Sequence, residues 1–103
     1  MANSNPPKKN QAFPMYITVG DATDNLSLKN TPTIASGDFK ISKDGGAFAN
    51  LTNLPTVTPA GSVSVKIELT ATEMNADQVL VTWIDQTNPK EWADGSLAIN
   101  TTA

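Results

Sequence analysis

The stretch Phe39-Lys-Ile-Ser-Lys-Asp-Gly-Gly-Ala-Phe-Ala49 decides the fold class of this chain. Polar and apolar residues alternate from Phe39 into an Asp-Gly-Gly sequence at residues 44–46, and a second short apolar run ends at Phe48. The tight primed turns that join antiparallel strands require positive φ, which glycine adopts without steric cost. The stretch therefore predicts a β-hairpin in an all-β protein.

Alternating and apolar runs predict further strands on both sides of the hairpin. The clearest alternation covers residues 62–69, where every second residue is apolar and one face of the strand would point inward. Residues 78–84 are almost continuously apolar, which is typical of a central strand. A strand over residues 13–19 contains Pro14, which lacks a backbone donor, so we expect this strand at a sheet edge. Shorter strands are expected at residues 26–28 and 97–101. The apolar residues at 51–57 are interrupted by Pro55, which suits a segment that switches between sheets better than a central strand.

About seven short strands with frequent turn signals are the pattern of an immunoglobulin-like β-sandwich. One helical element is expected within it. Residues Thr70-Ala-Thr-Glu73 have the spacing of a helix capping box, and Met74 follows directly. We therefore predict one helical turn that closes the end of the sandwich, with Met74 as its buried plug.

Residues 1–11 are expected to form an extended N-terminal arm, while residues 12–103 form the sandwich domain. The arm is polar, and its Pro6-Pro7 pair favours extended backbone. A terminus of this kind is disordered unless something holds it, and a neighbouring subunit is the support that we expect. The predicted partner-binding residues of the arm are Asn5, Pro6, Pro7, Lys8, Lys9, Asn10 and Gln11.

Length and charge limit the possible functions. The 103 residues are enough for one domain with one core. An apolar content of 39% leaves this core thin, so we expect neighbouring molecules to add stability. The net charge is −3, arginine is absent, and the lysines are dispersed apart from Lys8-Lys9. Nucleic-acid binding relies on clustered positive charge and is not expected.

Cysteine and histidine are both absent from the chain. Their absence excludes disulfides, Cys/His metal sites, cysteine nucleophiles and Ser-His relays. We therefore predict no enzyme activity, no metal and no cofactor. The N-terminal residues contain no apolar stretch like that of a secretion signal, and no run is long enough to span a bilayer. We expect synthesis in a cytoplasm and no membrane partner.

Carboxylates could still support calcium binding or glycoside hydrolysis. The densest group, Asp21-Ala-Thr-Asp24-Asn25, supplies two aspartates, whereas a calcium loop needs several oxygen ligands at alternating positions. Short Asx side chains that bond their own backbone in a turn explain this group more simply. Asp85, Glu91 and Asp94 are likewise expected to be solvated turn residues rather than a glycosidase pair.

The aromatic residues leave two interpretations open. Trp83 lies in the most apolar strand and is expected in the core. Trp92 lies in a loop flanked by charge, and because indole side chains are enriched in interfaces, Trp92 joins the predicted partner-binding residues. Together with Tyr16 it could instead form a platform on which a sugar stacks. The chain would then be a carbohydrate-binding module.

Three segments together resemble a recurrent small module of tailed-bacteriophage particles. They are Met15-Tyr-Ile-Thr-Val-Gly-Asp-Ala-Thr-Asp24, Gly37-Asp-Phe-Lys-Ile-Ser-Lys-Asp-Gly-Gly-Ala-Phe48 and Leu69-Thr-Ala-Thr-Glu-Met-Asn-Ala-Asp77. The resemblance covers residues 13–85 and implies an immunoglobulin-like sandwich in a virion protein. Such modules occur in capsid decorations, head fibres, tail fibres and baseplate adaptors, and they carry no catalytic motif.

The resemblance and the composition together favour a non-enzymatic structural protein of a phage virion. The leading hypothesis is a capsid decoration (cement) protein that binds the major capsid protein or other virion proteins and is homo-oligomeric in the particle. The chain ends just after the module, with no shaft or receptor-binding part, which favours a short accessory piece. A tail, neck or baseplate adaptor is the first alternative, and a carbohydrate-binding β-sandwich module is the second.

Overall fold

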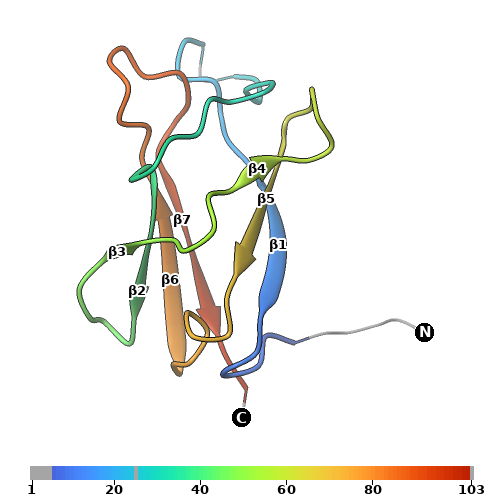
Figure 1. The fold of residues 1–103 in the computed structure, drawn as a ribbon. Coiled ribbons are helices and arrows are strands. Elements are labelled where there is room, and N and C mark those ends of the chain that lie inside the picture. The colour runs from blue at the N-terminus through green and yellow to red at the C-terminus, as the bar shows by residue number, and fades with distance from the viewer. Residues whose placement is uncertain (1–5, 25, 103) are drawn as a thin grey trace.

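Seven β-strands in two antiparallel sheets form this protein, in a computed structural model that describes residues 6–24 and 26–102 (Figure 1). The three-stranded sheet has the order β1 (Phe13–Thr18), β5 (Ser64–Leu69), β4 (Thr56–Val57). The four-stranded sheet has the order β3 (Ala49–Asn50), β2 (Phe39–Lys43), β6 (Gln78–Trp83), β7 (Gly95–Asn100). The sheets form two layers, so the predicted all-β class is confirmed.

The core lies between β5 and β6, the strands at the centre of the two sheets. Val65 and Ile67 of β5 are completely buried, and so are Val79 and Val81 of β6. In both strands these residues alternate with more exposed ones, because successive side chains of a strand point to opposite faces. The two core strands predicted at residues 62–69 and 78–84 are therefore confirmed.

Pro14 lies in β1, at the edge of the three-stranded sheet, as predicted. Thr58 N–H donates to the Ser64 carbonyl at 3.0 Å in register with the β4–β5 ladder, so even-numbered residues of β5 bond to β4. The odd-numbered residues bond to β1. Pro14 pairs with Glu68, and its nitrogen therefore points to the outer edge, where the ladder loses no donor.

The predicted hairpin joins β2 to β3 through a type I′ turn. Asp44 and Gly45 both have positive φ, 50° and 77°. Gly46 N–H closes the turn by donating to the Lys43 carbonyl at 2.9 Å. The Asp-Gly-Gly sequence is therefore used as expected, with glycine at the second of the two positive-φ positions.

The second strand of the hairpin begins later than predicted. The sequence places it at residues 47–48, but Ile41 pairs with Ala49, so one extra residue lies between the turn and β3. An extra residue on one strand is a bulge, and it shifts the alternation of side chains between the two faces. Phe48 is 51% exposed as a result.

The prediction of a short strand at residues 26–28 is wrong. Gly20 and Leu28 form a single isolated bridge, and this bridge does not extend into a ladder. The Asp24 carboxylate accepts a hydrogen bond from Leu26 N–H at 2.9 Å, which occupies a donor that a strand would need. The chain therefore turns here, and Leu26 is 92% exposed.

The helical turn expected after β5 is not confirmed. The capping box itself forms, because Glu73 N–H donates to Thr70 Oγ1 at 3.1 Å and Thr70 N–H donates to Glu73 Oε1 at 2.8 Å. Met74 is completely buried, as predicted for a plug. Its N–H donates to the Thr70 carbonyl, but Asn75 N–H donates to Thr72, three residues back, so the helix does not propagate. The described residues form no helix that could cross a membrane.

Residues 6–11 of the predicted arm lie against the same chain (Figure 1). Thr102 N–H donates to the Pro7 carbonyl at 2.8 Å, and Lys9 N–H donates to the Thr102 carbonyl at 2.9 Å, which makes a short parallel bridge beyond the end of β7. Asn10 N–H donates to the Met74 carbonyl at 3.1 Å. The sandwich itself therefore supplies backbone partners for these residues, and support by a neighbouring subunit stays a prediction.

Candidate functional site

Trp92 is completely buried, although the sequence places it in a charged loop. The backbone of its segment pairs with Asp21 in an isolated bridge. The indole Nε1 donates to the Thr33 carbonyl at 3.1 Å, and the indole centroid lies 5.8 Å from that of Phe39. The expected surface position of Trp92 is therefore corrected, because long-range contacts draw the loop onto the core and leave the indole out of reach of a partner.

The structure does not bring Tyr16 and Trp92 together as a sugar platform. Tyr16 is 58% exposed on β1, and Lys66 Nζ lies 5.9 Å from the centre of its ring. Trp92, in contrast, is part of the core. Of these two aromatic side chains only Tyr16 is exposed, so the carbohydrate-binding alternative loses the geometry on which it depended.

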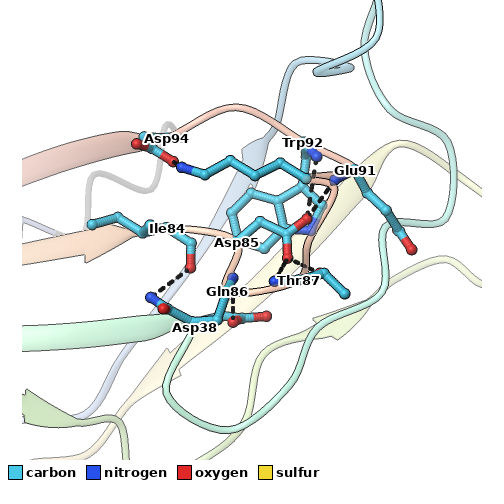
Figure 2. A network of polar contacts seen from close by, with 9 residues as sticks. Asp38, Ile84, Asp85, Gln86, Thr87, Glu91, Trp92 and Asp94 are labelled. Carbon is cyan, nitrogen blue, oxygen red and sulfur yellow. Dashed lines mark hydrogen bonds and ion pairs between the residues drawn. The ribbon is translucent and has the colours of Figure 1, made fainter.

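Asp85 is the centre of a buried polar network that the sequence did not reveal (Figure 2). Its Oδ1 accepts hydrogen bonds from the N–H of Thr87 at 2.9 Å and from the Thr87 hydroxyl. Its Oδ2 accepts from the N–H of Glu91 at 2.6 Å and of Trp92 at 3.4 Å. The expectation of a solvated turn residue is wrong for Asp85, whose side chain holds both ends of its loop. Asp94 is exposed, as expected, and bonds Lys90 Nζ.

The pKa of Asp85 lies below its ordinary value despite the burial of the side chain. Desolvation alone raises the pKa, because it disfavours the charged form. The hydrogen bonds from Thr87, Glu91 and Trp92 act in the opposite direction and together outweigh it. Asp85 is therefore held as a carboxylate that organises backbone N–H groups.

The aspartates considered for calcium bond their own turn instead. Asp21 Oδ1 accepts from Thr23 N–H at 2.8 Å, and Asp24 Oδ2 accepts from the Ser27 hydroxyl at 2.9 Å. Backbone and hydroxyl hydrogen bonds lower the pKa of Asp24. Within residues 6–24 and 26–102, no group of three or more potential metal ligands gathers. The turn interpretation is confirmed for these two residues, and Asn25 lies outside the described part of the chain.

Trp83 is 7% exposed and belongs to the core, as predicted. Its indole lies against Phe39, with ring centroids 5.9 Å apart, and covers Gly95 at the start of β7. A Cβ on Gly95 would lie 2.3 Å from Trp83 Nε1, which is much closer than van der Waals contact allows. Gly95 is therefore needed because the indole occupies the space of a side chain.

Replacing Gly95 with alanine is expected to lower the free energy of unfolding by about 1–3 kcal/mol, because the added methyl group displaces the Trp83 indole. Chemical denaturation followed by tryptophan fluorescence measures the change. The matched control is Gly20→Ala, whose Cβ would lie 3.8 Å from that of Ala93, an ordinary contact. Equal stability of the two variants would contradict this account of Gly95.

A shallow hollow lies beside β3, and no sequence pattern predicted it. It measures about 140 Å³ and is lined by Ser36, Gly37, Phe39, Asn50, Leu51, Thr52, Leu54 and Pro55. Pockets that bind small molecules are larger, roughly 300–1,000 Å³. The hollow therefore has room for a single side chain of a partner rather than for a cofactor.

The arm forms a polar surface beside the end of β7. Lys9 Nζ lies 2.5 Å from Asp77 Oδ1, and the hydrogen bond and charge of Asp77 raise the pKa of Lys9. Pro6, Lys8, Asn10 and Gln11 are exposed around this pair. Five of the seven predicted arm residues are thus exposed, Pro7 is half-buried, and Asn5 is outside the described residues.

Comparison with known proteins does not assign this fold or its surfaces to a family. No family model, no curated protein and no solved structure matches the chain.

Proposed function

We propose that this sandwich is of the immunoglobulin-like type. In immunoglobulin domains, strands B, E and D lie in one sheet and strands C, F and G in the other, with C′ added beside C in variable-type domains. The orders β1-β5-β4 and β3-β2-β6-β7 match this arrangement when β1 to β7 are taken as B, C, C′, D, E, F and G. The strand order therefore supports the proposal independently of the sequence segments.

We further propose that the protein is a non-enzymatic structural component of a phage virion, a decoration protein that binds and stabilises the capsid shell. The proposal that the protein is not an enzyme is supported by its buried carboxylates, which accept hydrogen bonds from backbone N–H groups. Asp38 accepts from the N–H groups of Ala35 and Gln86, and Glu73 accepts from Thr70 and Thr52. Like the carboxylate of Asp85, these two carboxylates stabilise loops through hydrogen bonds to the backbone.

The proposed mechanism is stabilisation by binding. A protein that binds the assembled shell, and not its separate parts, shifts the equilibrium toward the assembled state by mass action. The exposed arm, Pro6 to Gln11, is the surface that we place against the shell or a neighbouring subunit. Its position beside the C-terminal end of β7 offers a partner both the arm and the edge of the sheet in one contact.

Deleting residues 1–11 is expected to leave a folded sandwich that no longer binds capsids. The fold should persist because residues 6–11, the described part of the arm, contribute backbone bonds at Thr102 and Met74 but no buried core residue. Co-sedimentation with capsids measures binding, and thermal unfolding measures the fold. The matched control is Asp77→Asn, which removes the ion pair to Lys9 but keeps the arm. Full-strength capsid binding by a folded deletion variant would contradict the role of the arm.

Labelling of the protein in purified virions distinguishes the two virion hypotheses. A label distributed over the head in electron micrographs supports the decoration protein. A label confined to the tail, neck or baseplate would contradict it and favour the adaptor. Absence of the protein from purified virions would contradict both.

A further inference from the structure

The backbone of β7 has one side open to a further strand. Thr101 N–H donates to the Asp77 carbonyl at 3.0 Å, in the register of the β6–β7 ladder. Since bonded and non-bonded pairs alternate in antiparallel ladders, the odd-numbered residues of β7 bond to β6. The N–H and C=O groups of Ser96, Ala98 and Asn100 therefore face away from β6, and no described residue bonds to them.

The same edge already accepts an added segment at its end. Thr102 continues the outward-facing set, and it exchanges backbone hydrogen bonds with Pro7 and Lys9 of the arm. The arm therefore pairs as a short parallel strand on the side of the chain opposite β6. The edge at residues 96–100 is the direct continuation of this pairing surface.

The other sheet edges are short or blocked. β3 and β4 contain two residues each, and β1 contains Pro14, which cannot donate to an added strand. Proline, charged side chains and short length are the usual protections of edge strands against pairing. β7 has six residues, Gly-Ser-Leu-Ala-Ile-Asn, with no proline and no charged side chain. Among the described edge strands it is the one that lacks all of these protections.

We propose that β7 pairs edge to edge with β7 of a second copy of this chain, in antiparallel orientation about a two-fold axis. Ala98 stands opposite Ala98 of the partner subunit, and Ser96 stands opposite Asn100 of the partner subunit. Each of these residues presents both its N–H and its C=O outward, so all of these pairs are hydrogen-bonded. The two four-stranded sheets then form one continuous sheet. This pairing does not require the proposed place in a virion.

Leu97 gives this pairing an apolar component. Its side chain lies on the core-facing side of β7, opposite Val81 of β6, yet it is 40% exposed because it is at the margin of the sandwich. In the proposed register Leu97 lies beside Ile99 of the partner subunit, and cross-strand apolar neighbours of this kind stabilise sheets. On the outer face, the side chains that meet are small or uncharged.

Opposite charges at the two ends of β7 favour a second copy as the occupant. Asp94 directly precedes β7, whereas Lys8 lies beside Thr102 beyond its other end. Both side chains belong to exposed residues. An antiparallel two-fold arrangement brings Asp94 of each copy toward Lys8 of the partner subunit, so the charges are complementary.

A single introduced cysteine tests the register, since the chain contains no other cysteine. In a hydrogen-bonded antiparallel pair the Cα atoms are about 5.5 Å apart, within the range that a disulfide spans. Ala98→Cys, treated with oxidised glutathione, is expected to form a covalent dimer at least about tenfold faster than Thr18→Cys, a control at the outer edge of β1. Equal cross-linking rates of the two variants would overturn the proposal.

A charge at the same position tests the interface without a covalent bond. Ala98→Lys places two ammonium groups opposite each other and is expected to raise the dimer dissociation constant about tenfold or more. Sedimentation equilibrium over a range of concentrations measures it. Thr18→Lys carries the same charge on the edge of β1 and should leave the dimer unchanged, and thermal unfolding verifies both folds. A wild-type chain that stays monomeric at millimolar concentration, or a dimer that Ala98→Lys does not weaken, would overturn the proposal.

Discussion

Replacing Trp92 with alanine is expected to lower the free energy of unfolding by about 3–5 kcal/mol, the usual cost of removing a large aromatic side chain from a core. The indole is completely buried, lies against Phe39 and donates a hydrogen bond to Thr33. Its removal therefore leaves a cavity and an unpaired carbonyl. Domains of this size have only about 5–15 kcal/mol of stability in total, so the variant should unfold at a much lower temperature.

Calorimetry and urea denaturation measure the effect of Trp92→Ala. The matched control is Tyr16→Ala, whose exposed ring should change stability by about 0.5 kcal/mol or less. A Trp92→Ala variant with wild-type stability would contradict the core position of the indole. The expected instability also affects binding studies, because loss of binding in this variant would report unfolding rather than a lost contact.

Replacing Asp85 with asparagine is expected to cost about 2–4 kcal/mol, although the two side chains have almost the same shape. Asp85 accepts hydrogen bonds on both oxygens from Thr87, Glu91 and Trp92. The amide group of asparagine can accept on one side only, and its NH₂ group would face a backbone donor in a buried site. Urea denaturation at neutral pH measures the change. Asp94→Asn, in the same segment but exposed, is the control and should cost less than about 1 kcal/mol.

The pH dependence of this difference identifies its cause. Because the pKa of Asp85 is lower in the folded than in the unfolded protein, its contribution to stability is complete above the unfolded pKa, which is the ordinary aspartate value of 3.8. The contribution is lost as the pH falls through the lowered folded pKa. The difference in the free energy of unfolding between the wild type and Asp85→Asn should therefore become smaller as the pH falls below the unfolded pKa. A gap that stays constant between neutral and strongly acid pH would show that the carboxylate charge is not responsible.

Local sequence patterns predicted the parts of the fold that depend on local chemistry. Alternation identified β5, an apolar run identified β6, and Pro14 placed β1 at an edge. The Asp-Gly-Gly turn at residues 44–46 was found because positive φ leaves a signature in the sequence. Each of these inferences needed only a few neighbouring residues.

The candidate site was less predictable, because its residues are positioned by contacts between distant segments. Trp92 looked exposed because charged residues flank it in sequence, and Asp85 looked exposed because a turn follows it. Their burial follows from the pairing of Asp21 with Trp92 and from the hydrogen bond of the indole to Thr33. The docking of the arm on Thr102 likewise joins the two ends of the chain. No local pattern contains this information.

The parallel bridge between Lys8 and Thr102 is expected to affect how the domain responds to mechanical force applied at its termini. A pull on the two ends of the chain moves the paired segments lengthwise past each other, because they run in the same direction. The hydrogen bonds of Thr102 with Pro7 and Lys9 are then loaded in shear and must break together, rather than one after another as in a zipper. The hydrogen bonds between the arm and Thr102 are thereby expected to resist tension applied through the termini.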